Sequence, residues 1–397
     1  MTRALIVWGN WGPYHYARFS ALRDAGAQRG VEVLGLQLFS GSGVYDWDSE
    51  PRSDERGMHY LDLGHDETRF HPVRLTRDVA PLLRRLRPDV LLVPGFWHWA
   101  VCLHATARTL GARSVLLSDT HSGTAKAAGL KKRVKGLITR GFGAALVGGD
   151  SHRRYLAELG IAPANVFLGY CVVDGDHFRL AAQAVRSNAS EHRARLRLSE
   201  RYFLSLGRLV PKKDLGTLVR AYALFRKRAI DSAVDLVFVG SGPERESLER
   251  LAEEHGLAVI DHESTSVSWT SDGSVPHVHF YGFRQVDETP IFFALATAFV
   301  LPSIYEEWGL VINEAMACGL PILASKAAGA TEMLVDGDNG VVFSPGDVRA
   351  LADGLCRIAD EPGLAVRMGA ESERRVRDWD LDRFAQGALA AIDAAMA

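Results

Sequence analysis

The sequence predicts an α/β protein with two doubly wound parallel sheets. Its 397 residues exceed what one ordinary hydrophobic core holds, which favours two domains. The chain opens with an apolar run at 4–8, an amphipathic helical pattern at 15–30 and a second apolar run at 31–39. This strand–helix–strand order indicates parallel strands. A similar alternation begins near residue 201, so a second sheet is expected there.

The first half continues with apolar runs that predict strands at 88–95, 112–118 and 143–149. Residues 40–72 lose all periodicity and predict a long loop. The pattern breaks around 170–178, so we predict a first domain over residues 1–175 and a second over residues 176–378.

In the second half, strands are predicted at 201–207, 234–240, 277–282, 298–303 and 320–325. Helical patterns at about 363–376 and 381–396 follow, and residues 379–397 are expected to pack back toward the N-terminal domain. Residues 261–276 are polar and predict an inserted loop. No fixed-period repeat is present, which argues against a solenoid.

Composition narrows the class of protein. The chain is 47% hydrophobic and 24% charged with a net charge of −2, which fits a soluble globular protein and no nucleic-acid partner. The four cysteines are scattered and predict small core residues in a reducing compartment. No apolar run reaches 18 residues, and the N-terminal one is too short for a secretory signal, so a cytoplasmic location is expected.

Two acids stand out, Glu306 and Glu314, between a predicted strand and a short apolar-periodic helix. We place Glu306 on the loop and Glu314 in the first turns of the helix. The helix N-terminus at Gly309, Leu310 and Val311 could hold a phosphate through free N–H groups. Acids beside a phosphate site would suit a sugar nucleotide. The alternative is a strand–loop–helix with two solvated acids.

Other loops at the carboxyl ends of the second set of strands are GRLVPKKD (207–214), GSGPE (240–244) and GFRQ (282–285), where ligands bind in open parallel sheets. Each begins with glycine, as expected where the backbone turns tightly or approaches a ligand. Arg208 and Lys213 could offset a diphosphate, or form surface salt bridges instead. The GxGxxG dinucleotide fingerprint is absent from both halves.

Together these motifs resemble glycosyltransferase family 4, the retaining nucleotide-sugar transferases of the GT-B fold. The resemblance covers roughly residues 200–350 and rests on GRLVPKK, FVGSGPE, FYGF, PSIYEEWGLVINEAMACGLPILAS and GATEMLVDGDNGVVFSPGD. It implies two Rossmann-like domains facing across a cleft. The implied activity is hexosyl transfer from a nucleoside-diphosphate sugar, with UDP favoured because it is common in the family, to the hydroxyl of a glycan, lipid-linked or small-molecule acceptor.

The resemblance also implies roles for individual residues. Glu306 would contact hydroxyls of the donor sugar, Glu314 the ribose diol, and Arg208 and Lys213 the diphosphate. His121 lies where the family often has a functional histidine near the donor sugar, and it joins Glu306, Arg208 and Lys213 as a catalytic candidate. Glu307 and Trp308 replace a common Gly-Phe, and the added charge is expected to alter sugar preference. The remaining donor-binding candidates are Gly207, Gly240, Gly242, Phe283, Arg284, Gly309, Leu310 and Val311.

The family generally needs no metal, and none is expected as a cofactor. The triplets Asp46-Trp47-Asp48 and Asp378-Trp379-Asp380 look like metal motifs, but neither directly follows a predicted strand. His277 and His279 share one face of a strand, and we predict a packed or solvated pair there rather than a ligand pair.

The first half is expected to hold the acceptor. Aromatic residues gather in its predicted strand-end loops and either form a stacking surface for an acceptor or belong to the core and rim. They are Trp8, Trp11, Tyr14, Phe96, Trp97 and Trp99. His15 is a further candidate, and for both His15 and His121 the alternative is capping or packing.

Residues 126–140 predict a helix with six cations. A solvated basic face is predicted there, and contact with an anionic membrane is the alternative. Two other functions stay open: a nucleotide-sugar hydrolase or epimerase on the same frame, and a non-catalytic nucleotide-sugar-binding protein.

Overall fold

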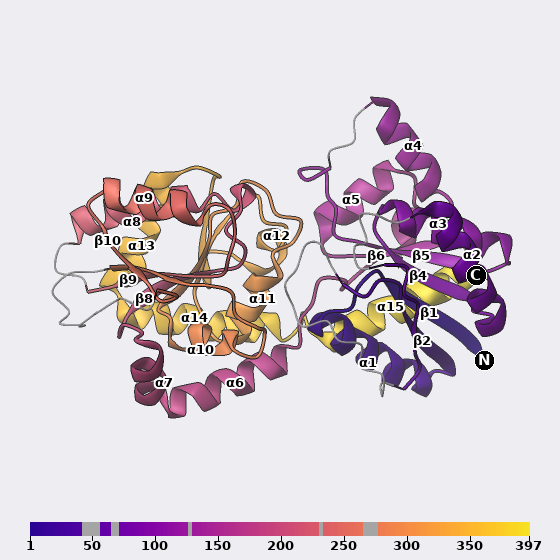
Figure 1. Cartoon of the computed structure of the whole chain (residues 1–397), viewed down its shortest axis with the longest axis horizontal. Helices are drawn as coiled ribbons and strands as arrows, with labels where there is room; N and C mark the ends of the chain where they lie inside the picture. The colour runs from indigo at the N-terminus through magenta and orange to yellow at the C-terminus, as the bar shows by residue number, and fades with distance from the viewer. Residues whose placement is uncertain (42–55, 65–70, 126–128, 230–232, 265–276) are drawn as a thin grey trace. The chain divides into compact units, whose positions relative to one another are not determined.

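The computed structural model describes residues 1–41, 56–64, 71–125, 129–229, 233–264 and 277–397. These form two compact units, Met1–Asp174 with Trp379–Ala397, and Gly175–Asp378. Each unit contains a seven-stranded sheet in which every recorded strand pairing is parallel (Figure 1). The predicted fold class, two doubly wound α/β sheets, is therefore confirmed.

The sheet of the first unit has the strand order β3-β2-β1-β4-β5-β6-β7. Chain order reverses between β1 and β4, and ligands of such sheets bind outside the strand ends at that reversal. The strands are β1 (Thr2–Trp8), β2 (Val31–Gln37), β3 (Met58–Tyr60), β4 (Val90–Pro94), β5 (Arg113–Ser118), β6 (Ala144–Val147) and β7 (Val166–Leu168).

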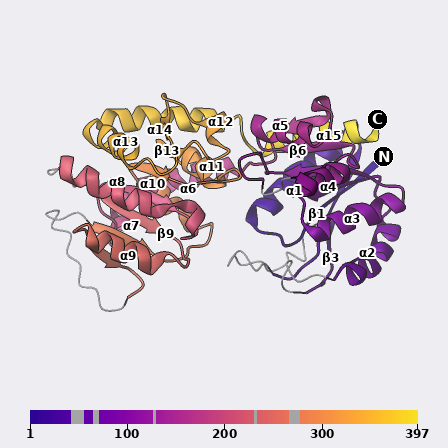
Figure 2. The ribbon, with the colours of Figure 1, turned by 90° about the horizontal axis from the view of Figure 1, so that it is seen from above.

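Six α-helices are described in the first unit, the last of them formed by the C-terminal residues. They are α1 (Pro13–Gln28), α2 (Pro72–Leu86), α3 (His98–Thr109), α4 (Gly129–Thr139), α5 (Asp150–Glu158) and α15 (Leu381–Met396). Helix α15 packs against α1, β6 and β7. The fit is close, because a Cβ on Gly387 would lie 2.3 Å from the carbonyl oxygen of Leu168. Both termini thus belong to this unit (Figure 2).

The sheet of the second unit has the order β10-β11-β9-β8-β12-β13-β14, with its reversal between β8 and β12. The strands are β8 (Tyr202–Leu206), β9 (Asp235–Val239), β10 (Ala258–Asp261), β11 (His277–Tyr281), β12 (Ala298–Leu301), β13 (Ile322–Ser325) and β14 (Gly340–Phe343).

Helices cover both faces of the second sheet. Its main apolar core lies between one face and α8, α9 and α13. On the other face, the Tyr202 hydroxyl donates to the carbonyl of Phe292 in α10 at 2.7 Å, and α10 in turn packs on α6 (Figure 1). The helices are α6 (Gly175–Ser187), α7 (Ala189–Leu196), α8 (Leu215–Arg228), α9 (Arg245–Glu254), α10 (Thr289–Leu295), α11 (Leu310–Ala317), α12 (Thr331–Leu334), α13 (Val348–Asp360) and α14 (Pro362–Val376).

The long loop predicted at 40–72 is wrong in part. Residues 58–60 form β3, which pairs with Gly35–Gln37 of β2, and α2 begins at Pro72. A three-residue edge strand is too short for its alternation to register as a periodic signal. Strands β7, β10 and β14 were also missed. Each lies at an edge of its sheet and mixes buried with half-buried or exposed residues, so it lacks the fully buried apolar run of the inner strands.

The structure also bears on the cysteines, the metal-like triplets and the question of a membrane-spanning helix. All four cysteines are free thiols. Of the metal-like triplets, Asp46–Asp48 lie outside the described residues, while Asp380 caps α15 by accepting the Arg383 N–H at 2.9 Å. Within the described ranges, no helix has the length and hydropathy to cross a membrane.

Candidate functional site

The loops that follow β8 and β12 meet at the reversal point of the second sheet. Residues 207–214 follow β8 and residues 302–309 follow β12. The Ile304 N–H donates to the Lys212 carbonyl at 2.9 Å and joins the two loops directly. Since β8 and β12 are adjacent and parallel, the fold brings Lys213 and Glu306 to one place.

The centre of this place is the carboxylate of Glu306, which is only 8% exposed. Lys213 Nζ lies 2.5 Å from its Oε2 atom, and Lys212 Nζ lies 3.2 Å from its Oε1 atom. Lys212 also contacts Glu307 Oε2 at 2.8 Å. Two acids and two lysines thus form a nearly balanced cluster, in which Lys213 is the less exposed lysine.

Electrostatics keeps this cluster charged. Burial alone would raise the pKa of Glu306, but Lys213 and Lys212 outweigh that effect and hold the pKa below its usual value. Burial would lower the pKa of Lys212, yet Glu306 and Glu307 raise it overall. Each lysine carries three donors, so pairing with Glu306 leaves donors that a phosphate could use.

Backbone hydrogen bonds from the loop after β13 hold the Glu306 loop in place. The Glu306 N–H donates to Ala327 at 3.2 Å, and its carbonyl accepts the Gly329 N–H at 3.2 Å. The buried Trp308 indole donates to the side chain of Asn313 in α11 at 2.8 Å. The loop carrying the acid is therefore tied both to the start of the next strand-end loop and to the following helix.

Helix α11 begins immediately after Gly309, whose φ of +91° lies in the left-handed region. Its first turn includes Leu310 and Val311, whose N–H groups have no acceptors within the helix by geometry. Glu314 follows in the second turn and is 4% exposed. Because Glu306 and Glu314 are both buried, the alternative of two solvated acids is excluded.

The glycines of the neighbouring loops serve close packing of backbone on backbone. A Cβ on Gly240 would lie 2.0 Å from the Gly207 carbonyl oxygen, and one on Gly242 would lie 2.3 Å from that of Leu209. Both residues also have positive φ angles, +139° and +155°. The β9 loop thus packs directly on the β8 loop, which shapes the site whether or not a ligand touches these glycines.

Arg208 and the pair Phe283–Arg284 lie at the edges of this region. Arg208 is exposed, and in the described part of the chain no hydrogen bond or ion pair of its side chain is recorded. Phe283 is half-buried, and its carbonyl accepts the Arg284 guanidinium at 2.8 Å. The structure therefore assembles Lys213, Glu306 and α11 at one place, while Arg208 stands outside the ion cluster.

In the first unit, His15 has a structural partner. Its Nδ1 atom accepts the Gly12 N–H at 3.0 Å and so caps α1. Burial and the nearby Arg18 lower the pKa of His15 to about 3, which keeps the ring neutral and able to accept. The capping alternative therefore holds for His15.

His121 lies on the loop after β5. Its Nδ1 atom accepts the Gly123 N–H at 3.2 Å, and its ring meets the ring of His152 edge to face at 5.1 Å. His152 is fully buried and accepts the Gly149 N–H at 3.1 Å. These contacts orient His121, and its role near a donor sugar stays a prediction.

The aromatic residues of the first unit divide into two groups. Trp11 and Trp99 are 0% and 1% exposed and pack in the core, so the proposed acceptor-facing role is wrong for these two. Trp8 is also buried, and its indole approaches the Tyr170 hydroxyl at 3.4 Å, so the acceptor-facing role is wrong for Trp8 as well. Trp97 is 45% exposed and remains a candidate for stacking on an acceptor.

Sequence reasoning missed two charged residues. Lys212 and Lys213 both pair with Glu306. The available signal was the sequence PKK, in which Lys212 directly precedes Lys213. Lys135 was counted with a basic helix face, but its Nζ lies 3.7 Å from the centre of the Phe96 ring and 3.2 Å from the Tyr155 hydroxyl. Burial lowers the pKa of Lys135 to about 8.

Helix α4 carries an apolar stripe on its surface. Leu130, Val134 and Leu137 are 76%, 50% and 71% exposed. Their spacing of four and three residues places them within about 60° of one another around the helix. Lys131 and Arg133, both exposed, flank this stripe.

Residues 200–361 match the family model described as "Glycosyl transferases group 1". A GDP-mannose-dependent alpha-(1-6)-phosphatidylinositol monomannoside mannosyltransferase of Mycolicibacterium smegmatis is 33% identical over 205 residues, 48% of each chain. A D-inositol 3-phosphate glycosyltransferase of Thermomonospora curvata is 31% identical over 255 residues, 61% of this chain and 55% of its own. The match thus spans about half the length of these relatives.

Solved structures agree over nearly the full chain. Sucrose-phosphate synthase from Thermosynechococcus elongatus has a TM-score of 0.71 at 20% identity and covers 98% of both chains. Anabaena HepE in complex with UDP and glucose has a TM-score of 0.72 at 16% identity, covering 99% of this chain and 100% of its own. At these identities the likeness concerns the fold. Residues 200–361 thus match a group 1 glycosyltransferase domain, in a chain with the GT-B fold that its motifs led us to expect.

Proposed function

We propose that this protein is a retaining glycosyltransferase of family 4 that uses a nucleoside-diphosphate sugar. The observation that carries the proposal is the cluster of Lys213, Glu306 and Lys212 beside the N-terminus of α11, at the reversal point of the second sheet. A group that binds there meets cations, a buried carboxylate and helix N–H groups together. Those are the partners that a diphosphate linked to a hydroxyl-rich sugar requires.

In the proposed reaction the bond between the sugar C1 atom and the diphosphate oxygen breaks, and its electron pair goes to the diphosphate. Lys213, Arg208 and the first N–H groups of α11 stabilise that growing charge. Glu306 holds donor-sugar hydroxyls and Glu314 the ribose diol. The acceptor hydroxyl attacks C1 from the same face, and its proton passes to the departing diphosphate. With the diphosphate charge stabilised in this way, the proposed reaction needs no metal.

The donor is tested by calorimetry with UDP, GDP, ADP and dTDP. UDP was favoured from the sequence, whereas the mycobacterial relatives are named for GDP-mannose. We expect one of the four to bind at least tenfold more tightly than the others, and Glu306→Gln to weaken binding of the sugar-bearing form more than that of the free diphosphate. No binding of any of the four would contradict the proposal.

Transfer itself is tested with the preferred donor and acceptors that include inositol phosphates and phosphatidylinositol mannosides, chosen from the names of the relatives. The expected result is a product that forms only when donor and acceptor are both present, with the donor's anomeric configuration kept. Conversion of donor at the same rate without acceptor would favour the hydrolase or epimerase. Binding without any conversion would favour a non-catalytic protein.

Contact with an anionic membrane is part of the proposal, because α4 exposes Leu130, Val134 and Leu137 beside Lys131 and Arg133. A solvated basic face would not need three exposed apolar side chains on one stripe. Apolar residues that enter the acyl boundary and cations that meet anionic headgroups are the two features of a helix that lies on a membrane. The surface would present lipid-linked acceptors to the enzyme.

A further inference from the structure

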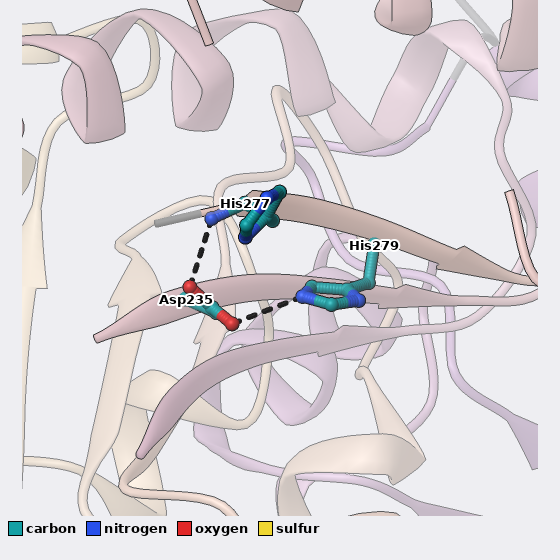
Figure 3. A group of neighbouring side chains, drawn as sticks. All are labelled: Asp235, His277 and His279. Carbon is teal, nitrogen blue, oxygen red and sulfur yellow. Dashed lines mark hydrogen bonds and ion pairs between the residues drawn. The ribbon is translucent and has the colours of Figure 1, made fainter. Parts of the chain in front are cut away.

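A second cluster of polar side chains lies in the second unit, at the N-terminal ends of its strands. The loops proposed to bind the donor, called the donor loops below, follow β8, β9 and β12 at the opposite ends. Asp235 is the first residue of β9 and His277 the first of β11, whereas the donor loops follow the last residues of their strands. Asp235 lies beside His277 and His279 on the adjacent parallel strand (Figure 3). Within the described residues, these three side chains are the one group of at least three His, Cys, Asp or Glu side chains close enough to share a metal ion.

The geometry is specific. The potential ligand atoms of the three side chains lie within 4.8 Å of one another. Asp235 Oδ2 is 3.0 Å from His279 Nε2, and Asp235 Oδ1 accepts the His277 N–H at 2.8 Å (Figure 3). The Ser199 hydroxyl also donates to Asp235. The carboxylate is therefore held in place before any ion arrives.

The second nitrogen of His279 is also engaged. His279 Nδ1 lies 2.9 Å from His262 Nε2, and the His262 ring stacks on Tyr281 with centroids 3.8 Å apart. Histidines that bind metals usually have their other ring nitrogen fixed by a hydrogen bond, which sets the orientation of the ligand atom. His279 is fully buried, whereas His277 is partly exposed and gives an ion a path from solvent.

We propose that Asp235, His277 and His279 form a binding site for a divalent transition-metal ion, with Zn²⁺ as the preferred ion and water as the fourth ligand. Two imidazoles and one carboxylate are a ligand set that zinc accepts, whereas Mg²⁺ and Ca²⁺ require oxygen ligands. Coordination needs His279 Nε2 without a proton, so the neutral ring would bind as the tautomer whose Nδ1–H donates to His262 Nε2.

A bound ion would join β9 to β11 at the N-terminal ends of these strands, opposite the loops proposed to bind the donor. It would stabilise the second unit and take no part in transfer of the sugar. The site is thus independent of the proposed function, and its test uses no substrate.

The test titrates the untagged, chelator-treated full chain with ZnCl₂ by calorimetry and follows Tm in parallel. His277→Ala removes a partly exposed ligand, and Asp235→Asn removes the carboxylate charge but keeps an acceptor. His255→Ala is the control, since His255 is exposed at the end of α9 and outside the cluster. We expect one Zn²⁺ per chain for wild type and His255→Ala, with an increase in Tm on binding. We expect at least tenfold weaker binding for both cluster variants.

Absence of zinc binding to the wild type, or equal binding by wild type and His277→Ala, would overturn the proposal and leave a structural Asp–His hydrogen bond. Circular dichroism of each variant without zinc shows whether it is folded. His277→Ala is the decisive variant, because loss of a partly exposed ring does not open the core.

Discussion

At the scale of single residues, Glu306 is shared by two lysines that are not equivalent. Lys213 binds only Glu306 in the recorded ion pairs and has a side chain 13% exposed, whereas Lys212 also binds Glu307 and is 27% exposed. Lys213 is therefore the cation held in the driest part of the cluster, where a charge interacts most strongly with a diphosphate.

We predict that Lys213→Met weakens binding of the preferred nucleoside diphosphate at least tenfold, or about 1.4 kcal/mol. Lys212→Met is the matched control and is expected to cost about threefold or less, because Glu306 keeps Lys213. Calorimetry of the two variants side by side measures the difference. Equal losses, or a larger loss for Lys212→Met, would contradict the assignment of Lys213 to the diphosphate.

The pKa of Glu306 gives a second prediction at this scale. Since folding lowers this pKa, the charged carboxylate stabilises the folded state above its ordinary value of 4.5, and that stabilisation is lost as pH falls through the folded value. Glu306→Gln should therefore be much less stable than wild type at pH 7, and the gap should narrow at acid pH. Urea unfolding across pH 3–7 measures it, with the exposed Glu253→Gln as a control that follows wild type. If the difference in stability between wild type and Glu306→Gln did not change with pH, the ion pairs would not be its source.

Sequence reasoning reached some of these residues and not others for physical reasons. Glu306 and Lys213 were identified because motif and strand-end position coincide. The burial of Trp11 and the capping role of His15 depend on which way a side chain turns at the start of α1. Local sequence does not fix that direction, since an aromatic residue in a strand-end loop can face core or ligand equally well.

At the scale of elements, Gly309 sets the start of α11. Its φ of +91° disfavours any residue with a Cβ, and an added Cβ would lie 3.1 Å from Leu301. We predict that Gly309→Ala costs about 1–2 kcal/mol of stability and weakens nucleotide binding, because the N–H groups of α11 shift with the turn. Urea unfolding and calorimetry measure the two effects.

The control for that substitution is Gly337→Ala. Gly337 is exposed, lies in the same unit, and has no atom within 4 Å of an added Cβ. Its variant should match wild type in both assays. If Gly309→Ala also matched wild type, the helix N-terminus would not be the phosphate site.

Helix α4 gives the second prediction for an element. The double variant Leu130→Ser, Leu137→Ser should lose most co-sedimentation with anionic vesicles, because each buried leucine contributes about 1.5–3 kcal/mol. Binding of the wild type should weaken at high salt and on neutral vesicles. Val366→Ser removes a side chain 74% exposed on α14 and is the control. Wild-type protein that stays in the supernatant with anionic vesicles at low salt would rule out the membrane contact.

Elements were predictable where apolar runs were long. The strands that precede the loops proposed to bind the donor, β8, β9 and β12, were expected within a few residues of their observed bounds. The cluster of Asp235 with His277 was out of reach, because it depends on β9 and β11 being neighbours in the sheet. Strand order is a long-range property, and periodicity along the chain carries no information on it.

At the scale of the whole molecule, the chain returns to its first unit after completing the second. Helix α15 packs on α1, β6 and β7, and Phe384 within it is fully buried. The stability of the first unit thus depends on residues that follow the entire second unit.

Phe384→Ala should therefore destabilise the first unit selectively, by about 3–5 kcal/mol, because it leaves a cavity in that core. The reciprocal variant is Phe293→Ala, which removes an equally buried ring from α10 in the second unit. Hydrogen exchange resolved by peptide should show faster opening of β6, β7 and α1 in Phe384→Ala, with nucleotide affinity within about twofold of wild type. In Phe293→Ala the second unit should open faster and nucleotide binding should weaken. If Phe384→Ala accelerated exchange equally in both units, the two would unfold as one cooperative body, and the energetic division inferred from their separate cores would be wrong.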